Sequence, residues 1–189
     1  MRIGIMGGTF DPIHIGHLIA ASEVHRALKL DQVLFIPAGQ PWQKADYEVS
    51  PSADRLAMVE LAVAHDDRFA TSDIEIRREG ATYAVDTIEQ LRAENPDHEF
   101  FWIVGDDVLV RIPTWHDWKK FIEQVTVVAV NRAGSENLDV LFEYERIEMP
   151  EVRVSATALR ERFAHGDDCQ YLVPDAVAEY VHAHGLYQS

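Results

Sequence analysis

The chain has 189 residues, 47% of them hydrophobic, which is enough to bury the core of one domain. Its 32 acidic and 17 basic residues give a net charge of −15, which argues against nucleic acid or an anionic membrane as partner. No apolar run is as long as a transmembrane helix, the N-terminal run is too short for a signal peptide, and Cys169 is the only cysteine. We therefore expect a cytoplasmic protein without an intramolecular disulfide.

The N-terminal segment is the most informative. A short apolar strand, residues 2–6, runs into a turn that contains Gly7 and Gly8, and the helix that follows carries His14 and His17. Backbone N–H groups in a glycine turn form an anion-binding concavity, and the first turn of the next helix adds unpaired donors and the positive end of its dipole. The two histidines, three positions apart, are expected on one face of that turn. The segment therefore predicts a phosphate-binding site.

Strands and helices alternate through the next part of the chain. The predicted strands are residues 33–36, 72–77, 100–104 and 125–130, and the predicted helices between them are residues 54–64 and 86–93. This order implies an α/β fold with a doubly wound parallel sheet and right-handed crossovers. Ligands in such folds bind at the carboxyl ends of the strands, where the first glycine turn, Pro37 and Gly105 all fall.

The last sixty residues are less regular. They begin with a polar surface loop, residues 131–137, and a strand region, residues 147–154, that Pro150 interrupts. A helix with Ser155 as N-cap follows, and a final helix runs from Pro174 to Gly185. With no linker or repeat, we expect one domain, residues 1–189, in which residues 151–189 form a small helical C-terminal part.

The start of the first of these two C-terminal helices carries groups suited to phosphate. Ser155 and Thr157 offer hydroxyls at a helix N-terminus, and Arg160 offers five guanidinium donors. Taken alone, this segment is better interpreted as a capped helix with a solvated arginine. Its combination with His14 and His17 favours a second half of the phosphate site.

Two familiar phosphate loops are absent from the sequence: no Gly-x-Gly-x-x-Gly follows the first strand, and no Gly-Lys-Ser or Gly-Lys-Thr occurs. The N-terminal segment instead resembles the signature of the nucleotidyltransferase superfamily, Gly-x-Phe-x-Pro-x-His-x-Gly-His. The matching positions are Gly8, Phe10, Pro12, His14, Gly16 and His17. Residues 154–160 resemble the Ile-Ser-Ser-Thr-x-Ile-Arg segment of the same superfamily, with Ala156 in place of its second serine.

Further segments resemble the nicotinate-nucleotide adenylyltransferase family. Residues 37–44 match its Pro-Pro-His-Lys run only at Pro41 and Lys44, because Trp42 and Gln43 depart from it. Its other segments are Gly-x-Asp-x7-Trp, Thr/Ser-Tyr-x-x-Asp-Thr and Tyr-Leu-x-Pro, and they match at Gly105, Asp107 and Trp115, at Thr82 and Tyr83, and at Tyr171, Leu172 and Pro174. Only residues 131–150 add nothing to the resemblance.

The resemblance implies a Rossmann-like nucleotidyltransferase that joins nicotinate mononucleotide to ATP. It implies His14, His17 and Arg160 as catalytic residues. The ATP-binding residues it implies are Gly7, Gly8, Thr9, Phe10, His14, His17, Gly105, Asp107, Ser155, Thr157 and Arg160. Those for nicotinate mononucleotide are Lys44, Thr82, Tyr83 and Trp115. Mg²⁺ is expected, bound mainly through the ATP phosphates and not by protein ligands, and homo-oligomerisation is left open.

Two alternatives stay open at this point. The chain could be another adenylyltransferase of the superfamily, of the pantetheine-phosphate type, or a nucleotide-binding sensor without catalytic activity. Individual residues also have simpler interpretations: Trp115 as packing, Lys44 as a surface lysine and Asp107 as a helix cap.

Overall fold

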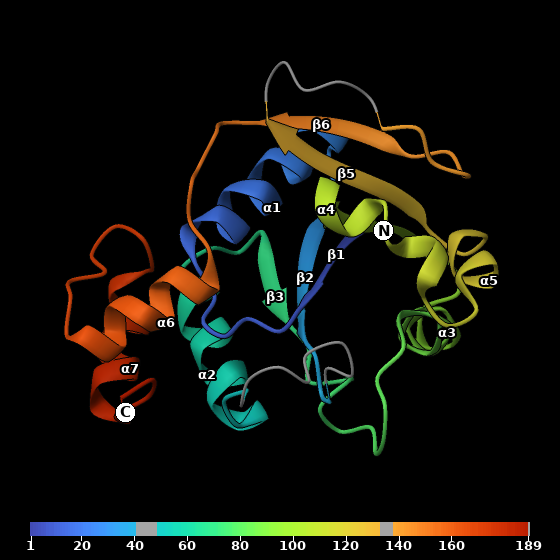
Figure 1. The fold of residues 1–189 in the computed structure, drawn as a ribbon. Helices are drawn as coiled ribbons and strands as arrows, with labels where there is room; N and C mark the ends of the chain where they lie inside the picture. The colour runs from blue at the N-terminus through green and yellow to red at the C-terminus, as the bar shows by residue number, and fades with distance from the viewer. Residues whose placement is uncertain (41–48, 133–137, 189) are drawn as a thin grey trace.

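A computed structural model describes residues 1–40, 49–132 and 138–188 of the chain. Its core is a sheet of six parallel strands in the order β3-β2-β1-β4-β5-β6, flanked by helices (Figure 1). The elements in chain order are β1 (Arg2–Gly8), α1 (Ile15–Leu28), β2 (Gln32–Pro37), α2 (Ser52–Val63), β3 (Phe69–Thr71), α3 (Ala84–Glu94), β4 (Glu99–Gly105), α4 (Asp106–Leu109), a 3-10 turn (Ile112–Thr114), α5 (Trp118–Ile122), β5 (Thr126–Arg132), β6 (Glu145–Met149), α6 (Ala156–His165) and α7 (Asp175–Ala183).

The strand order reverses direction between β1 and β4. β1 pairs with β2 on one side, with Gly8 opposite Pro37, and with β4 on the other. β4 pairs in turn with β5, with Gly105 opposite Val130. The crevice at the carboxyl ends of β1 and β4 is therefore the switch point where doubly wound sheets bind ligands.

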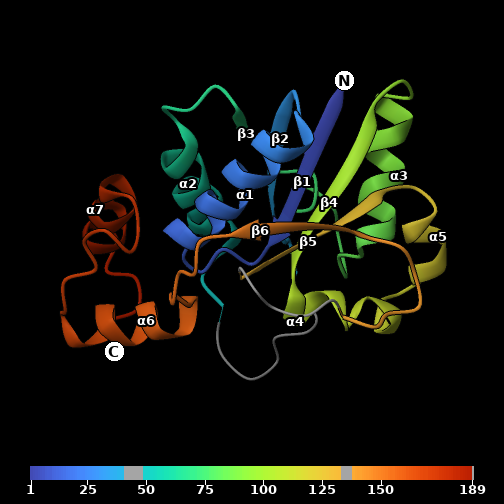
Figure 2. The ribbon, with the colours of Figure 1, turned by 90° about the horizontal axis from the view of Figure 1, so that it is seen from above.

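Helices cover both faces of the sheet, as Figure 2 shows from above: α1 and α2 lie on one side, and α3 and α5 lie on the other. The strands alternate accordingly. On β4, Phe101 and Ile103 join the core cluster beneath α1 and α2, whereas Trp102 and Val104 join the cluster beneath α3 and α5. This pattern of two buried faces explains the continuous apolar runs of the strands.

The C-terminal helices α6 and α7 pack beside α1 and α2 (Figure 1). The Tyr180 hydroxyl on α7 donates to Asp54 Oδ1 on α2 over 2.8 Å. The turn between α6 and α7 also touches the start of α1, because the Ile15 N–H donates to the Leu172 carbonyl over 3.0 Å. Among the described residues, no helix is long and apolar enough to cross a membrane.

The predicted α/β class and doubly wound sheet are confirmed, as are the strands β1, β2, β4 and β5 and the Ser155-capped helix. The strand predicted at residues 72–77 is wrong. The chain closes on itself there, because the Arg77 N–H donates to the Asp73 carbonyl and the Ser72 hydroxyl accepts from the Ile74 N–H. The strand in this region is β3, just before it. Of the predicted loop at 131–137, residues 131 and 132 belong to β5, and the others lie outside the described residues.

Candidate active site

A cavity of about 700 Å³ opens at the carboxyl ends of β1 and β4. It brings together most of the residues predicted for the site. Those that line it are Gly7, Gly8, Thr9, His14, His17, Thr82, Tyr83, Gly105, Asp107, Trp115, Ser155 and Thr157. Phe10 and Arg160 do not line it, and Lys44 lies outside the described residues.

The glycine turn after β1 is tightly packed against two aromatic rings. A Cβ at position 7 would stand 3.2 Å from the Trp102 ring, and one at position 8 would stand 3.1 Å from the Phe10 ring. Phe10 itself is buried and packs edge-on against His17, with ring centroids 5.1 Å apart. Its side chain supports the turn from within the core, so its predicted contact with ATP stays a prediction.

His14 and His17 form a stacked pair where α1 begins. Their ring centroids are 3.7 Å apart, and the ring planes differ by 19°. The backbone N–H of His14 donates to Nδ1 of His17 over 3.2 Å, so the proton of a neutral His17 ring lies on Nε2. Gly16, between the two residues, lets the chain before α6 approach: a Cβ there would stand 3.1 Å from Val154 Cγ1 and from His14 Nδ1.

The two rings have different environments. His14 is buried, and its Nδ1 has no hydrogen-bond partner among the described residues. Burial lowers the pKa of His14 to about 4, so its ring is neutral near pH 7. A neutral, buried ring can stack on His17 without charge repulsion, which holds His17 in one orientation at the cavity wall.

The start of α6 forms a second wall that is rich in polar groups. Ser155 caps the helix, with its hydroxyl accepting from the Ala158 N–H over 3.3 Å. Arg160 donates through Nη2 to the Thr157 hydroxyl over 3.3 Å, and through Nη1 to the Asp11 carbonyl over 2.8 Å. The structure thereby joins the two segments that the sequence analysis connected, although about 150 positions separate them.

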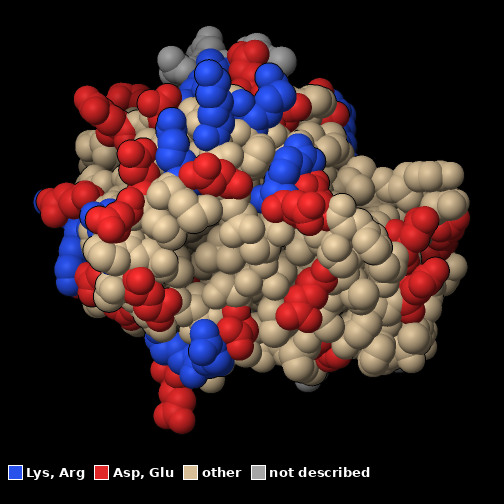
Figure 3. Space-filling view, turned by 180° about the vertical axis from the view of Figure 1, so that it is seen from behind, with Lys and Arg blue, Asp and Glu red and all other residues tan. Residues whose placement is uncertain are grey.

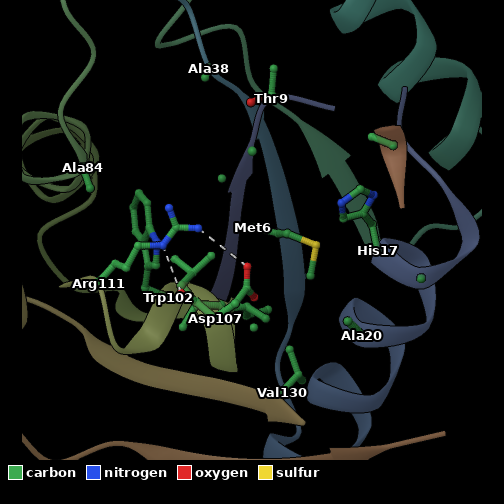
Figure 4. A pocket seen from close by; sticks show the side chains of 18 of the residues that line it. Met6, Thr9, His17, Ala20, Ala38, Ala84, Trp102, Asp107, Arg111 and Val130 are labelled. Atoms are coloured by element: carbon green, nitrogen blue, oxygen red, sulfur yellow. Dashed lines mark hydrogen bonds and ion pairs between the residues drawn. The ribbon is translucent and has the colours of Figure 1, made fainter. Parts of the chain in front are cut away.

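The wall across from α1 comes from the segment after β4. Figure 4 shows His17 and Met6 on one side of the cavity, and Asp107 with Arg111 on the other. The Arg111 guanidinium donates through Nε to the Asp107 carbonyl over 3.2 Å and lies 3.9 Å from the Asp107 carboxylate. Gly105 leaves room for that carboxylate, because a Cβ there would stand 2.9 Å from Asp107 Oδ1.

Aromatic rings gather at one part of the cavity. Tyr83 and His116 lie with ring centroids 4.4 Å apart, and Trp115 packs on Phe121 with centroids 5.3 Å apart. Trp115 is half-buried and lines the cavity, which agrees with the packing interpretation, while its contact with the mononucleotide stays a prediction. The Thr82 hydroxyl accepts from the Gln40 N–H over 3.0 Å, which ties the segment before α3 to the loop after β2.

The buried guanidinium of Arg55 holds the loops beside the site in place. Arg55 is 1% exposed, and its guanidinium donates to the carbonyls of Thr9, Gly39 and Ser50 over 2.9 to 3.1 Å. One side chain thus fixes the loops that follow β1 and β2. We therefore assign Arg55 a structural role.

Three titratable side chains of the cavity were missed by the sequence analysis: Glu75, Arg111 and His116. Glu75 is buried and accepts from the Thr87 hydroxyl over 2.8 Å. Burial raises the pKa of Glu75 to about 7, against the Thr87 hydrogen bond and the nearby Arg78 and Arg55 charges, which lower it. Arg111 could have been found from its i,i+4 spacing to Asp107, whereas the inward position of Glu75 depends on the mispredicted segment.

No group of three or more His, Cys, Asp and Glu side chains that could hold a metal ion occurs among the described residues. In the part of the chain that the structure describes, the polar side chains that line the cavity are histidines, hydroxyls and Arg111, with only two carboxyl groups, those of Glu75 and Asp107. This set suits phosphate oxygens and does not form a carboxylate cage for Mg²⁺.

The chain is similar to known proteins over nearly its whole length. Residues 5–162 match the family described as cytidylyltransferase-like. A probable nicotinate-nucleotide adenylyltransferase of Dehalococcoides mccartyi is 44% identical, over 99% of this chain and 97% of that protein. One of Geobacillus thermodenitrificans is 45% identical, over 98% of this chain and 86% of that protein. A Plasmodium falciparum nicotinic acid mononucleotide adenylyltransferase, solved in complex with NaAD, shares the fold with a TM-score of 0.82 at 17% identity, covering 98% of this chain and 97% of that one.

Proposed function

The chain belongs to the nicotinate-nucleotide adenylyltransferase family, and from this premise we propose that it transfers the adenylyl group of ATP to nicotinate mononucleotide in NAD biosynthesis. The products are nicotinate adenine dinucleotide and pyrophosphate. The observation that carries the proposal is one cavity that joins a phosphate wall, made by the glycine turn, His17 and Thr157, to an aromatic wall that contains Trp115. The first wall suits the triphosphate of ATP, and the second suits a flat pyridine ring.

The reaction is an in-line displacement at the α-phosphorus of ATP. A phosphate oxygen of the mononucleotide forms the new bond to this phosphorus, and the bond from it to the oxygen bridging to the β-phosphorus breaks. Pyrophosphate leaves with that bond's electron pair. The attacking phosphate is already ionised at neutral pH, so no general base is needed. The protein has to align two anions that repel each other and to stabilise the charge that develops on the phosphoryl oxygens.

The phosphate wall supplies the donors for this task. His14 and His17 are assigned to the α- and β-phosphates, with His17 donating from the Nε2–H that its hydrogen bond to the His14 backbone leaves in place. Ser155, Thr157 and Arg160 are assigned to the β- and γ-phosphates. Arg160 does not line the cavity in the free protein, so this assignment requires its guanidinium to reach the phosphates from its position beside Thr157.

The aromatic wall is assigned to the mononucleotide. Trp115 offers a ring face for stacking, and Thr82 and Tyr83 line the same cavity, with Tyr83 against His116, the residue after Trp115. The assignment of Lys44 to the mononucleotide phosphate rests on the sequence alone. Asp107, with Gly105 beside it, is assigned to the ribose hydroxyls of ATP, because a carboxylate accepts hydrogen bonds from hydroxyl groups.

Mg²⁺ is proposed to arrive with ATP. The histidine, hydroxyl and amide donors of the cavity suit phosphate oxygens and leave the ion to the phosphates and water. When bound, the ion neutralises part of the charge on the phosphate chain.

The remaining expectations are proposals as well. A single domain over residues 1–189 is supported by the contact of α7 with α2 through Tyr180 and Asp54. Acidic side chains are spread over the face shown in Figure 3, while Lys and Arg side chains gather mainly in its upper part. The net charge of −15 supports small-molecule partners and neither nucleic acid nor an anionic membrane. A cytoplasmic location and homo-oligomerisation stay predictions.

A coupled assay for pyrophosphate release tests the function. The purified protein is given ATP, Mg²⁺ and one acceptor at a time: nicotinate mononucleotide, nicotinamide mononucleotide or pantetheine phosphate. Turnover is expected with nicotinate mononucleotide above the other two. Turnover with pantetheine phosphate alone would support the alternative adenylyltransferase, and nucleotide binding without turnover on any acceptor would support a sensor.

A further inference from the structure

Tyr187, near the C-terminal end of the chain, reaches the phosphate turn at its N-terminal end. Its hydroxyl donates to Asp11 Oδ1 over 2.7 Å, across 176 positions in sequence. Asp11 is 1% exposed, and its other carboxylate oxygen accepts from the Ser50 N–H over 3.2 Å. Burial, with the Asp11 carboxylate beside it, raises the pKa of Tyr187 well above its usual range, so the phenol remains a donor.

Asp11 connects both halves of the phosphate site. It lies in the segment between Gly8 and His14, and its backbone carbonyl accepts from Arg160 Nη1 over 2.8 Å. The same guanidinium donates to the Thr157 hydroxyl at the start of α6. A shift of Asp11 therefore moves Arg160 relative to the turn.

Tyr187 also contacts α6 directly. Its ring stacks on Phe163, with centroids 5.9 Å apart and planes 30° apart. Phe163 lies one helical turn after Arg160 on α6. Tyr187 thus touches the turn through its hydroxyl and the helix of Arg160 through its ring.

We infer that Tyr187 is a positioning residue for the reaction: it sets the distance between the glycine turn with its histidines and the Thr157–Arg160 segment, so that both halves meet one triphosphate. The inference rests on the proposed function for the identity of the ligand. Tyr187 is not among the residues that line the cavity, so we assign it no direct contact with substrate. We expect Tyr187 to affect the binding and reaction of ATP, because both segments that it joins are assigned to ATP. Small errors in the alignment of reacting groups lower the reaction rate strongly.

The test compares two variants that each remove one hydroxyl. Tyr187→Phe keeps the ring and loses the hydrogen bond to Asp11. Tyr180→Phe is the matched control. Tyr180 also lies in the C-terminal part, and its hydroxyl donates to a carboxylate over 2.8 Å. That carboxylate belongs to Asp54 on α2, and neither residue lines the cavity. Circular dichroism and thermal unfolding establish that both variants fold.

Tyr187→Phe is expected to lower kcat/KM for ATP by about tenfold and to change KM for nicotinate mononucleotide by less than about twofold. It should also weaken the binding of a non-hydrolysable ATP analogue, measured by calorimetry. Tyr180→Phe should lose less thermal stability, because Asp54 is only half-buried, and its kcat/KM for ATP should stay within about twofold of wild type.

Equal kcat/KM for ATP in Tyr187→Phe and wild type would overturn the inference. An equal loss of kcat/KM for ATP in Tyr180→Phe would also overturn it, because Tyr187 would then act only by stabilising the fold. A wild-type protein inactive on nicotinate mononucleotide would contradict the proposed function instead. In that case, the calorimetric comparison of ATP-analogue binding still decides the role of Tyr187.

Discussion

The imidazole rings of His14 and His17 stack at the cavity wall with their centroids 3.7 Å apart, the first ring buried and the second half-buried. Burial lowers the pKa of His14 to about 4, so His17 packs on an uncharged ring near pH 7. The His14 backbone N–H fixes the tautomer of His17. The pair therefore orients the Nε2–H of a neutral His17 ring at the cavity wall, and our proposal assigns this donor to a phosphate oxygen of ATP.

We predict that His17→Ala lowers kcat by about two or more orders of magnitude with only a modest change in KM, because a donor aimed at developing charge contributes mainly to the transition state. Steady-state kinetics with both substrates measures this. His65→Ala is the control, since His65 is an exposed histidine in the turn after α2 and outside the cavity. A His17→Ala enzyme within threefold of wild type would remove the proposed role.

Trp115→Ala is expected to weaken the binding of nicotinate mononucleotide by roughly 1 to 3 kcal/mol, the range known for bases stacked on aromatic side chains, and to leave ATP binding nearly unchanged. Calorimetry with each substrate provides the measurement. Trp118→Ala serves as the control because Trp118 packs on Phe142 and does not line the cavity. Equal losses for both substrates in Trp115→Ala would show that Trp115 acts by packing on Phe121.

Lys44→Ala is expected to raise KM for the mononucleotide more than KM for ATP, because in a protein of net charge −15 a local cation contributes to the capture of an anion. Lys44→Arg should recover part of the loss, since it restores the charge. Varying each substrate in turn gives the two constants. A defect that falls mainly on ATP would assign Lys44 to the triphosphate.

Glu75→Gln is expected to stabilise the protein at alkaline pH. The folded-state pKa of Glu75, about 7, lies above its ordinary value of 4.5, so folding binds a proton between these two pH values and wild-type stability falls as pH rises through this window. A glutamine keeps an acceptor for the Thr87 hydroxyl but does not titrate. The two proteins should be about equally stable below pH 4.5, and the variant more stable by up to about 3 kcal/mol above pH 7.

Urea unfolding of both proteins at several pH values between 4 and 8 measures this difference. Taking the difference between variant and wild type cancels the contribution of His14, whose lowered folded-state pKa acts in the opposite direction, with stability lost as pH falls below its ordinary value of 6.5. A difference that does not change with pH would show that Glu75 is ionised in the folded protein.

The fold class and most residues of the candidate site could be predicted from the amino-acid sequence. Apolar runs that end at glycine predicted strands such as β1 and β4, because a strand buried on both faces needs a continuous apolar sequence. The motif residues His14, His17, Ser155 and Thr157 could be found because a helix N-terminus that binds phosphate needs particular residue types at fixed, short spacings.

The position of Glu75 and the long-range contacts of Asp11 could be known only from the three-dimensional structure. The segment 72–77 alternates like a strand, but its side chains and backbone groups bond locally, and this places Glu75 in the cavity wall. The contacts of Asp11 with Arg160 and Tyr187 join positions 149 and 176 apart. Periodicity and motif spacing describe neighbours along the chain, whereas a hydrogen bond between distant segments depends on how the helices pack on the sheet, and no local pattern records it.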